Sequence, residues 1–139
     1  EAMKTAVLSS LGKYRDFGLL VLRVGVGGMF ILYGWPKISG GPGGWAEIGG
    51  AMGYVGIHVW PTVWGGAAAV AEFVGGILLV LGLFTRAAAL LLLCTMIVAV
   101  AFHLGRGDGI GGASHAIELA CVFFGLLFLG PGRHSVDGR

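Results

Sequence analysis

Four long apolar segments constrain the fold of this chain more than any other feature. A helix needs about 20 apolar residues to cross a hydrocarbon core of about 30 Å, because each residue adds about 1.5 Å. Four stretches are long enough and carry few charges; they are residues 17–36, 61–84, 87–104 and 114–131. Only the short FTRA stretch, residues 84–87, joins the second to the third. The sequence predicts an all-α integral membrane four-helix bundle, with residues 1–139 forming one domain.

The composition agrees with a membrane protein. Charged residues make up 12% of the chain and the mean hydropathy is +0.88, whereas soluble domains carry about 25% charged residues. The formal net charge is only +2 and no basic cluster occurs, so we expect no nucleic-acid partner. The chain has 28 glycines, which allow helix backbones to approach closely. Glycine-rich faces on the first two spans would permit a homo-oligomer in the lipid bilayer.

The basic residues predict an orientation. Two of them fall on one side of the predicted membrane, Lys37 and Arg106, and most of the others fall on the opposite side: Lys4, Lys13, Arg15, Arg86, Arg133 and Arg139. The positive-inside rule then places both termini in the cytoplasm. In an alternative interpretation, residues 4–34 are a secretory signal peptide. No small-x-small cleavage site follows the apolar run, which argues against that alternative.

The segment between the first two spans, residues 38–60, contains a second amphipathic pattern. Its GGPGG sequence resembles a flexible breaker, and apolar residues then recur at helical spacing: Trp45, Ile48, Met52 and Val55. This spacing predicts a short interfacial helix in the first extracytoplasmic loop. Such a helix could be a plain lid on the bundle or the outer wall of a ligand pocket.

Arg23 interrupts the first apolar run, where an unpaired charge costs several kcal/mol. It lies about 12 Å above Arg15 on an α-helix, and Glu72 lies about 21 Å above Arg86. An extended arginine can bridge much of the remaining gap, so we predict an Arg23–Glu72 pair. The pair would either lock two helices together or form part of a site.

A second group of polar residues combines Glu118 with two histidines. His115 and Glu118 are three residues apart on one helix face, and His103 ends the preceding span. These residues could relay protons or could be hydrogen-bonded caps at the membrane edge. Their spacing matches no closed metal site, and we expect neither haem nor a metal ion. Cys94 and Cys121 form no CxxC motif and are predicted to be small core residues.

Several short motifs in this order resemble the DoxX family. They are RVGVGGMFILYGWPKI, GIHVWP, AEFVGGILLVLGLFTRAAALLLLCTMIVA and LGPGRHSVDG, which together cover nearly all of residues 18–138. The family's recurrent positions correspond here to Arg23, Gly34, Lys37, Glu72, His103, Gly130, Pro131, Gly132, Ser135 and Asp137. The resemblance implies a four-helix protein of the bacterial cytoplasmic membrane. It also implies relatives linked to thiosulfate:quinone oxidoreduction or to thiol and superoxide defence complexes.

We therefore expect a component of a quinone-linked oxidoreductase, with quinone as the cofactor and a membrane redox complex as its setting. The predicted catalytic residues, which would move protons, are Glu72, His103 and Glu118. The predicted substrate- or quinone-binding residues are Arg23, Lys37, Trp35 and His115. Two alternatives stay open: a non-catalytic adaptor or chaperone-like subunit of a larger complex, and a small proton-coupled transporter.

Overall fold

The computed structural model describes residues 1–138, and all regular structure in that range is helical. A short helix α1 (Ala2–Ser9) and a 3-10 turn η1 (Ser10–Tyr14) lead into α2 (Arg15–Ser39). Three further long helices follow: α4 (Pro61–Leu81), α5 (Thr85–Gly105) and α6 (Gly109–Leu129). In the described residues, four helical segments are long and apolar enough to cross a membrane, which confirms the predicted fold class.

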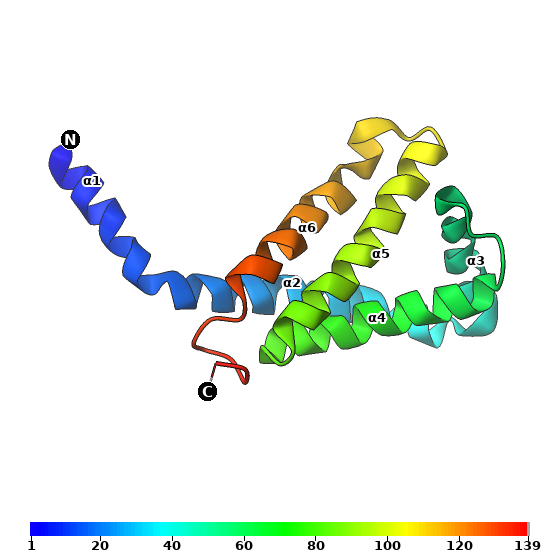
Figure 1. Ribbon diagram of the computed structural model, residues 1–139, viewed down its shortest axis with the longest axis horizontal. Coiled ribbons are helices and arrows are strands. Elements are labelled where there is room, and N and C mark those ends of the chain that lie inside the picture. Colours follow the sequence, from blue (N-terminus) through cyan, green and yellow to red (C-terminus); the bar gives the residue numbers. More distant parts are fainter. Residues whose placement is uncertain (139) are drawn as a thin grey trace.

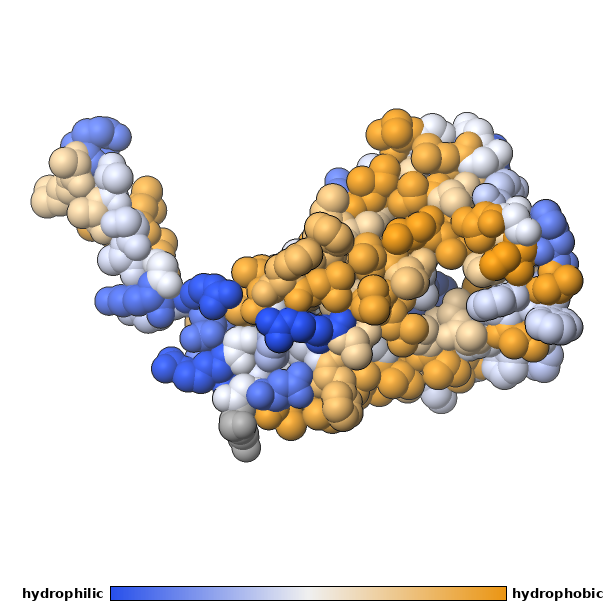
Figure 2. Space-filling view, in the orientation of Figure 1, coloured by the Kyte–Doolittle hydropathy of each residue, from blue (hydrophilic) through white to orange (hydrophobic). Residues whose placement is uncertain are grey.

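The four long helices form two pairs that meet at one end and diverge at the other (Figure 1). Helix α2 packs along α4, and α5 packs along α6, while α4 contacts α5. Arg15 begins α2, Arg86 lies in the first turn of α5 and Arg133 follows α6, so we call the end where the pairs meet the arginine end. The opposite end, where the pairs diverge, is called the α3 end. Hydrophilic residues gather around the arginine end, whereas apolar residues cover most of the helices (Figure 2).

Glycines bring α2 and α4 into close contact. A Cβ atom on Gly27 would lie 2.6 Å from the carbonyl oxygen of Gly76, and one on Gly76 would lie 2.7 Å from that of Gly27. Nearer the α3 end, a Cβ on Gly34 would lie 2.8 Å from the backbone nitrogen of Phe73. This contact is the close backbone approach that small residues permit between membrane helices.

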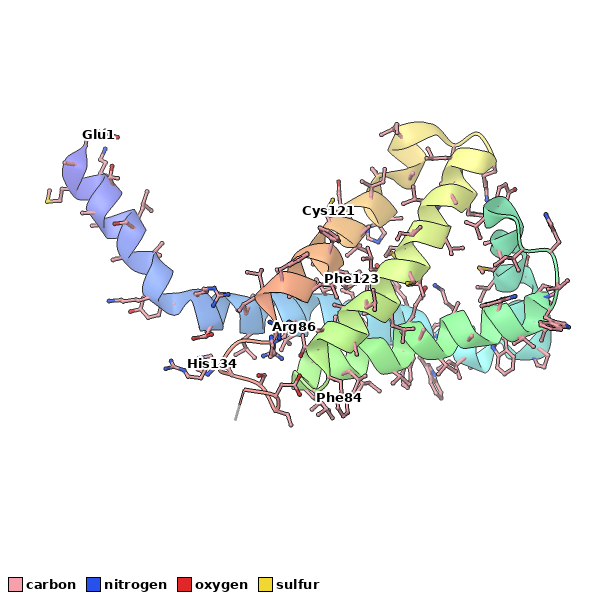
Figure 3. The ribbon with its side chains drawn as sticks, in the orientation of Figure 1. Glu1, Phe84, Arg86, Cys121, Phe123 and His134 are labelled. Carbon is pink, nitrogen blue, oxygen red and sulfur yellow. The ribbon has the colours of Figure 1, made fainter. Side chains whose placement is uncertain are left out.

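The core lies between the two helix pairs. Leu79, Leu92 and Phe123 are fully buried, and the Phe123 ring meets the Phe30 ring edge to face with centroids 5.3 Å apart. Phe123 lies on the side of α6 that faces α5, whereas Cys121 points outward (Figure 3). This aromatic contact packs α6 against α2 and so joins the two helix pairs.

The predicted loop helix exists as α3 (Gly41–Gly49), continued by the 3-10 turn η2 (Gly50–Val55). Helix α3 packs on α4, and η2 packs on α5. Glycines fix the first contact, because a Cβ on Gly65 would lie 1.6 Å from the Trp45 carbonyl oxygen. The prediction of a flexible breaker at GGPGG is wrong, since α3 begins within it and carries Pro42 in its first turn, where proline is tolerated.

The helix ends differ from the predicted boundaries for local reasons. Helix α4 stops at Leu81 because Gly82 adopts a left-handed conformation with φ of 69°. Helix α6 begins at Gly109, five residues before the predicted span, because the glycine-rich link is itself helical. It ends at Leu129, before Gly130 (φ 74°) and Pro131. Arg139, one of the basic residues used to predict orientation, lies outside the described residues.

Candidate functional site

Arg23 is completely buried, and its partners are backbone carbonyls. Its guanidinium donates to the carbonyl oxygen of Leu79 at 3.0 Å and to that of His134 at 2.5 Å. The Leu79 carbonyl belongs to the last turn of α4, where unpaired carbonyls and the negative end of the helix dipole attract a cation. The predicted Arg23–Glu72 pair is therefore wrong: Arg23 joins α4 to the C-terminal tail, toward the arginine end.

Two other charged side chains at the arginine end, Asp137 and Arg86, also bind backbone groups. Asp137 accepts hydrogen bonds from the amides of Phe84 and Thr85, both at 3.0 Å, and so caps the start of α5. These amide donors, that of Thr85 first, hold the pKa of the Asp137 carboxyl below its usual range. Arg86 donates to the Leu127 carbonyl oxygen at 2.9 Å. This end is thus a set of side-chain caps on helix termini and on the tail.

At the α3 end the charged groups bind one another. Lys37, in the last turn of α2, lies 2.5 Å from the Glu72 carboxylate of α4. The Glu72 side chain is only 8% exposed, whereas that of Lys37 is 37% exposed. The buried Glu72 carboxylate is thus paired with a lysine that stays partly exposed.

The first cavity at this end, called the α3 cavity, has a volume of about 520 Å³ and lies between α3, η2, α4 and α5. The surface is hollowed between these elements (Figure 2). Four of its lining side chains are charged or hydroxylic: Lys37, Glu47, Glu72 and Thr95. Most of the others are apolar and include Ile48, Met52, Trp64, Ala67, Ala71, Leu91, Val98 and Phe102. Helix α3 and η2 therefore form one wall of a pocket.

A second cavity, called the histidine cleft, has a volume of about 620 Å³ and opens between α2, α5 and α6. Its lining includes His103, His115, Tyr33, Met96 and Leu119. Lys37 and Glu72 line this cleft as well as the α3 cavity. The ion pair therefore stands between a largely apolar cavity and a cleft that carries two imidazoles.

His103 has a carboxylate partner that the sequence interpretation missed. Its Nδ1 lies 2.8 Å from Oδ2 of Asp108, and Arg106 Nε lies 3.1 Å from the same oxygen. The hydrogen bond from His103, together with the charge of Arg106, holds the pKa of the Asp108 carboxyl below its usual range. A signal was available in the sequence, because Asp108 follows His103 by five residues across a glycine-containing turn.

The structure brings together four of the seven predicted site residues: Lys37, Glu72, His103 and His115. The other three line neither cavity. Arg23 is held at the arginine end, Trp35 is exposed with its ring 5.8 Å from that of Phe73, and Glu118 is exposed on α6.

The two cysteines were predicted to be core residues, and this prediction is wrong, because both are exposed. Cys94 lines the α3 cavity, whereas Cys121 lines neither cavity. Between residues 1 and 138, no three histidine, cysteine or carboxylate side chains lie close enough together to share a metal ion.

Four apolar helices enclosing a polar pair define a small multi-pass membrane protein. The family model described as DoxX matches residues 18–104, and the chain belongs to this family. The match includes Arg23, Lys37, Glu72, Arg86 and His103, and it ends before the α5–α6 turn, α6 and the tail.

Curated relatives cover nearly the whole chain. An uncharacterised protein of Haemophilus influenzae is 35% identical over 138 residues, which are 95% of this chain and 97% of the relative. Inner membrane protein YqjF of Escherichia coli is 33% identical over 90% of this chain and 93% of its own length. Inner membrane protein YphA of the same species is 32% identical over 91% and 97%. No solved structure matches the chain significantly.

Proposed function

We propose that this protein binds a quinone in the α3 cavity and acts as the quinone-binding component of a redox system in the bacterial inner membrane. The observation that carries the proposal is the Lys37–Glu72 pair, which lines both the α3 cavity and the histidine cleft. The names of the Escherichia coli relatives support the location. The arginine-rich end supports an orientation with both termini in the cytoplasm.

The residues present fit a group that has an apolar body and hydrogen-bond acceptors at its rim. The α3 cavity, at about 520 Å³, falls within the range of about 300–1,000 Å³ that is usual for small-molecule sites. Its lining is mostly alanine, leucine, valine and aromatic side chains, with few convergent polar groups. This combination is the usual composition of a site that sequesters an apolar ligand and orients it through a few polar contacts.

Lys37 would hold a ring oxygen of the ligand. Its ammonium has three donors, and the contact with Glu72 uses one of them. Trp45 donates its indole N–H to the Lys37 carbonyl at 3.0 Å, so α3 also fixes the backbone of this residue. A neutral carbonyl oxygen of a ligand could accept from the remaining donors without breaking the ion pair.

Glu72 and His103 would move protons between the histidine cleft and the ligand. A bound quinone supplies two-electron redox chemistry, in which two protons accompany the two electrons. Glu72 lines both cavities, and His103 and His115 line the histidine cleft with it. In this proposal, a proton that enters the histidine cleft would pass to the α3 cavity through Glu72, which lines both.

Binding of ubiquinone-1 and menaquinone-1 to the purified protein in lipid nanodiscs tests the proposal. Isothermal titration calorimetry should detect binding to the natural protein and a loss of about tenfold or more in Glu72→Gln, the effect of one or two hydrogen bonds. The matched control is Glu118→Gln, because this glutamate lines neither cavity. No binding to the natural protein, or equal binding in both variants, would contradict the proposal.

One observation favours the adaptor alternative. Glu118 is exposed on α6, and within residues 1–138 it has no hydrogen bond or ion pair. A carboxylate on a lipid-facing surface is costly, and a partner helix with a basic or hydrogen-bonding side chain would relieve the cost. Co-purification of one membrane protein with the natural chain, lost in Glu118→Gln, would support this function.

A further inference from the structure

We infer that Asp108 is a positioning residue that holds the His103 imidazole in its Nδ1–H form and leaves Nε2 as the basic nitrogen for the histidine cleft. Only the role of this tautomer rests on the proposed function, because an imidazole that transfers protons needs one defined basic nitrogen. The tautomer itself follows from this chain's own contacts.

The turn between α5 and α6 fixes the two residues relative to each other. His103 lies in the last turn of α5, and Asp108 is the residue directly before α6. The amide of Asp108 donates to the His103 carbonyl oxygen at 3.0 Å, and the amide of Gly107 donates to that of Leu104 at 3.2 Å. Gly107 has a φ of 86°, which favours glycine. The side-chain contact is thus built on a backbone that already joins the pair.

The charge of Asp108 decides which nitrogen carries the proton. An ionised carboxylate only accepts hydrogen bonds, so the Nδ1 atom that lies 2.8 Å from it has to donate. Arg106 Nε, 3.1 Å from the same oxygen, keeps the carboxylate charged. In a neutral imidazole with Nδ1 protonated, Nε2 holds the lone pair.

The second ring nitrogen of His103 is the one left available to the histidine cleft. His103 lines the histidine cleft together with Lys37, Glu72 and His115. Because Nδ1 is engaged by Asp108, only Nε2 remains to accept a proton or a hydrogen bond from a group in the cleft. The same arrangement, a carboxylate behind an imidazole, orients histidines in many catalytic and metal sites.

Nitrogen-15 NMR of histidine-labelled protein in nanodiscs tests the inference directly. At a pH where the rings are neutral, His103 should show a protonated Nδ1 and an unprotonated Nε2. A His103→Gln variant assigns its signals among the four histidines of the chain. A wild-type spectrum with His103 protonated at Nε2 would overturn the inference without any variant.

Two variants separate positioning from a general effect on folding. Asp108→Ala should shift His103 toward the Nε2–H form that unconstrained imidazoles prefer, while the signals of the other histidines stay in place. Arg106→Gln is the matched control, since it removes the second partner of Asp108 and should leave His103 as Nδ1–H. An unchanged tautomer in Asp108→Ala would also overturn the inference. The measurement needs no quinone, so a failure of quinone binding would refute the proposed function alone.

Discussion

The two ends of this molecule use charged residues in opposite ways. At the arginine end, Arg23, Arg86 and Asp137 bind backbone groups at helix termini and in the tail. At the α3 end, Lys37 and Glu72 bind each other and line two cavities. The side chains at the arginine end are buried or engaged with backbone groups, whereas the partly exposed Lys37 keeps hydrogen-bond donors free for a ligand. The comparison separates residues that hold the fold from residues available for chemistry.

The largest expected effect on stability comes from Arg23→Met. Two hydrogen bonds from a buried guanidinium are lost, each worth about 1.5–3 kcal/mol, so the free energy of unfolding should fall by about 3–6 kcal/mol. Thermal or chemical unfolding in detergent measures the change. Glu72→Gln is the contrasting variant and should cost about 1 kcal/mol or less, because Lys37 is partly exposed. An equal loss of unfolding free energy in Arg23→Met and Glu72→Gln would contradict the view that only the arginine end holds the fold.

A smaller loss is expected where α2 crosses α4. In Gly27→Ala, the new Cβ would lie 2.6 Å from the Gly76 carbonyl oxygen, so the helices must separate at a cost of about 1–3 kcal/mol. Gly25→Ala on the same helix is the control, since a Cβ there meets nothing within 4 Å and alanine favours helix. Unfolding of both variants under one condition checks the difference. A Gly27→Ala protein as stable as Gly25→Ala would show that this close contact does not hold α2 against α4.

The smallest effect concerns pH at the arginine end. Because the amides of Thr85 and Phe84 depress the pKa of Asp137, its contribution is present above the unfolded value of about 3.9 and is lost as the pH falls through the lower folded value. The protection factor of the Thr85 amide, corrected for the intrinsic exchange rate at each pH, should therefore fall below about pH 4. Asp137→Asn should show weaker protection and little acid dependence. An identical acid response in that variant would assign the effect to another group.

Much of the fold could be predicted because apolar length alone determines a membrane span. The four runs and the amphipathic spacing after Trp45 correspond to α2, α4, α5, α6 and the α3–η2 segment. The boundaries were less accurate, because the glycine-rich links at residues 41–44 and 109–112 are helical here. Glycine permits a turn but does not require one, so packing against α4 or α5 decides the outcome.

The pairing of charges could not be predicted from depth along straight helices. Arg23 and Glu72 were expected to be about 9 Å apart along the membrane normal, yet Arg23 extends toward the opposite end and Lys37 takes its place. The end of a neighbouring helix offers carbonyls that a sequence pattern does not display. The way two helices shift along each other is equally invisible in the sequence, and the packing of α2 on α4 places Lys37 beside Glu72.

The most direct measurement of the central claim uses the two cysteines. Cys94 lines the α3 cavity, and Cys121 is exposed on α6 away from both cavities. Alkylation by N-ethylmaleimide is followed at each cysteine by mass spectrometry, with and without ubiquinone-1 at about ten times its dissociation constant. Mass action predicts about tenfold slower alkylation of Cys94 only, and a slowing of about twofold or less in Glu72→Gln at the same ubiquinone-1 concentration. Unchanged alkylation of Cys94, or equal protection of Cys121, would contradict a quinone site beside the Lys37–Glu72 pair.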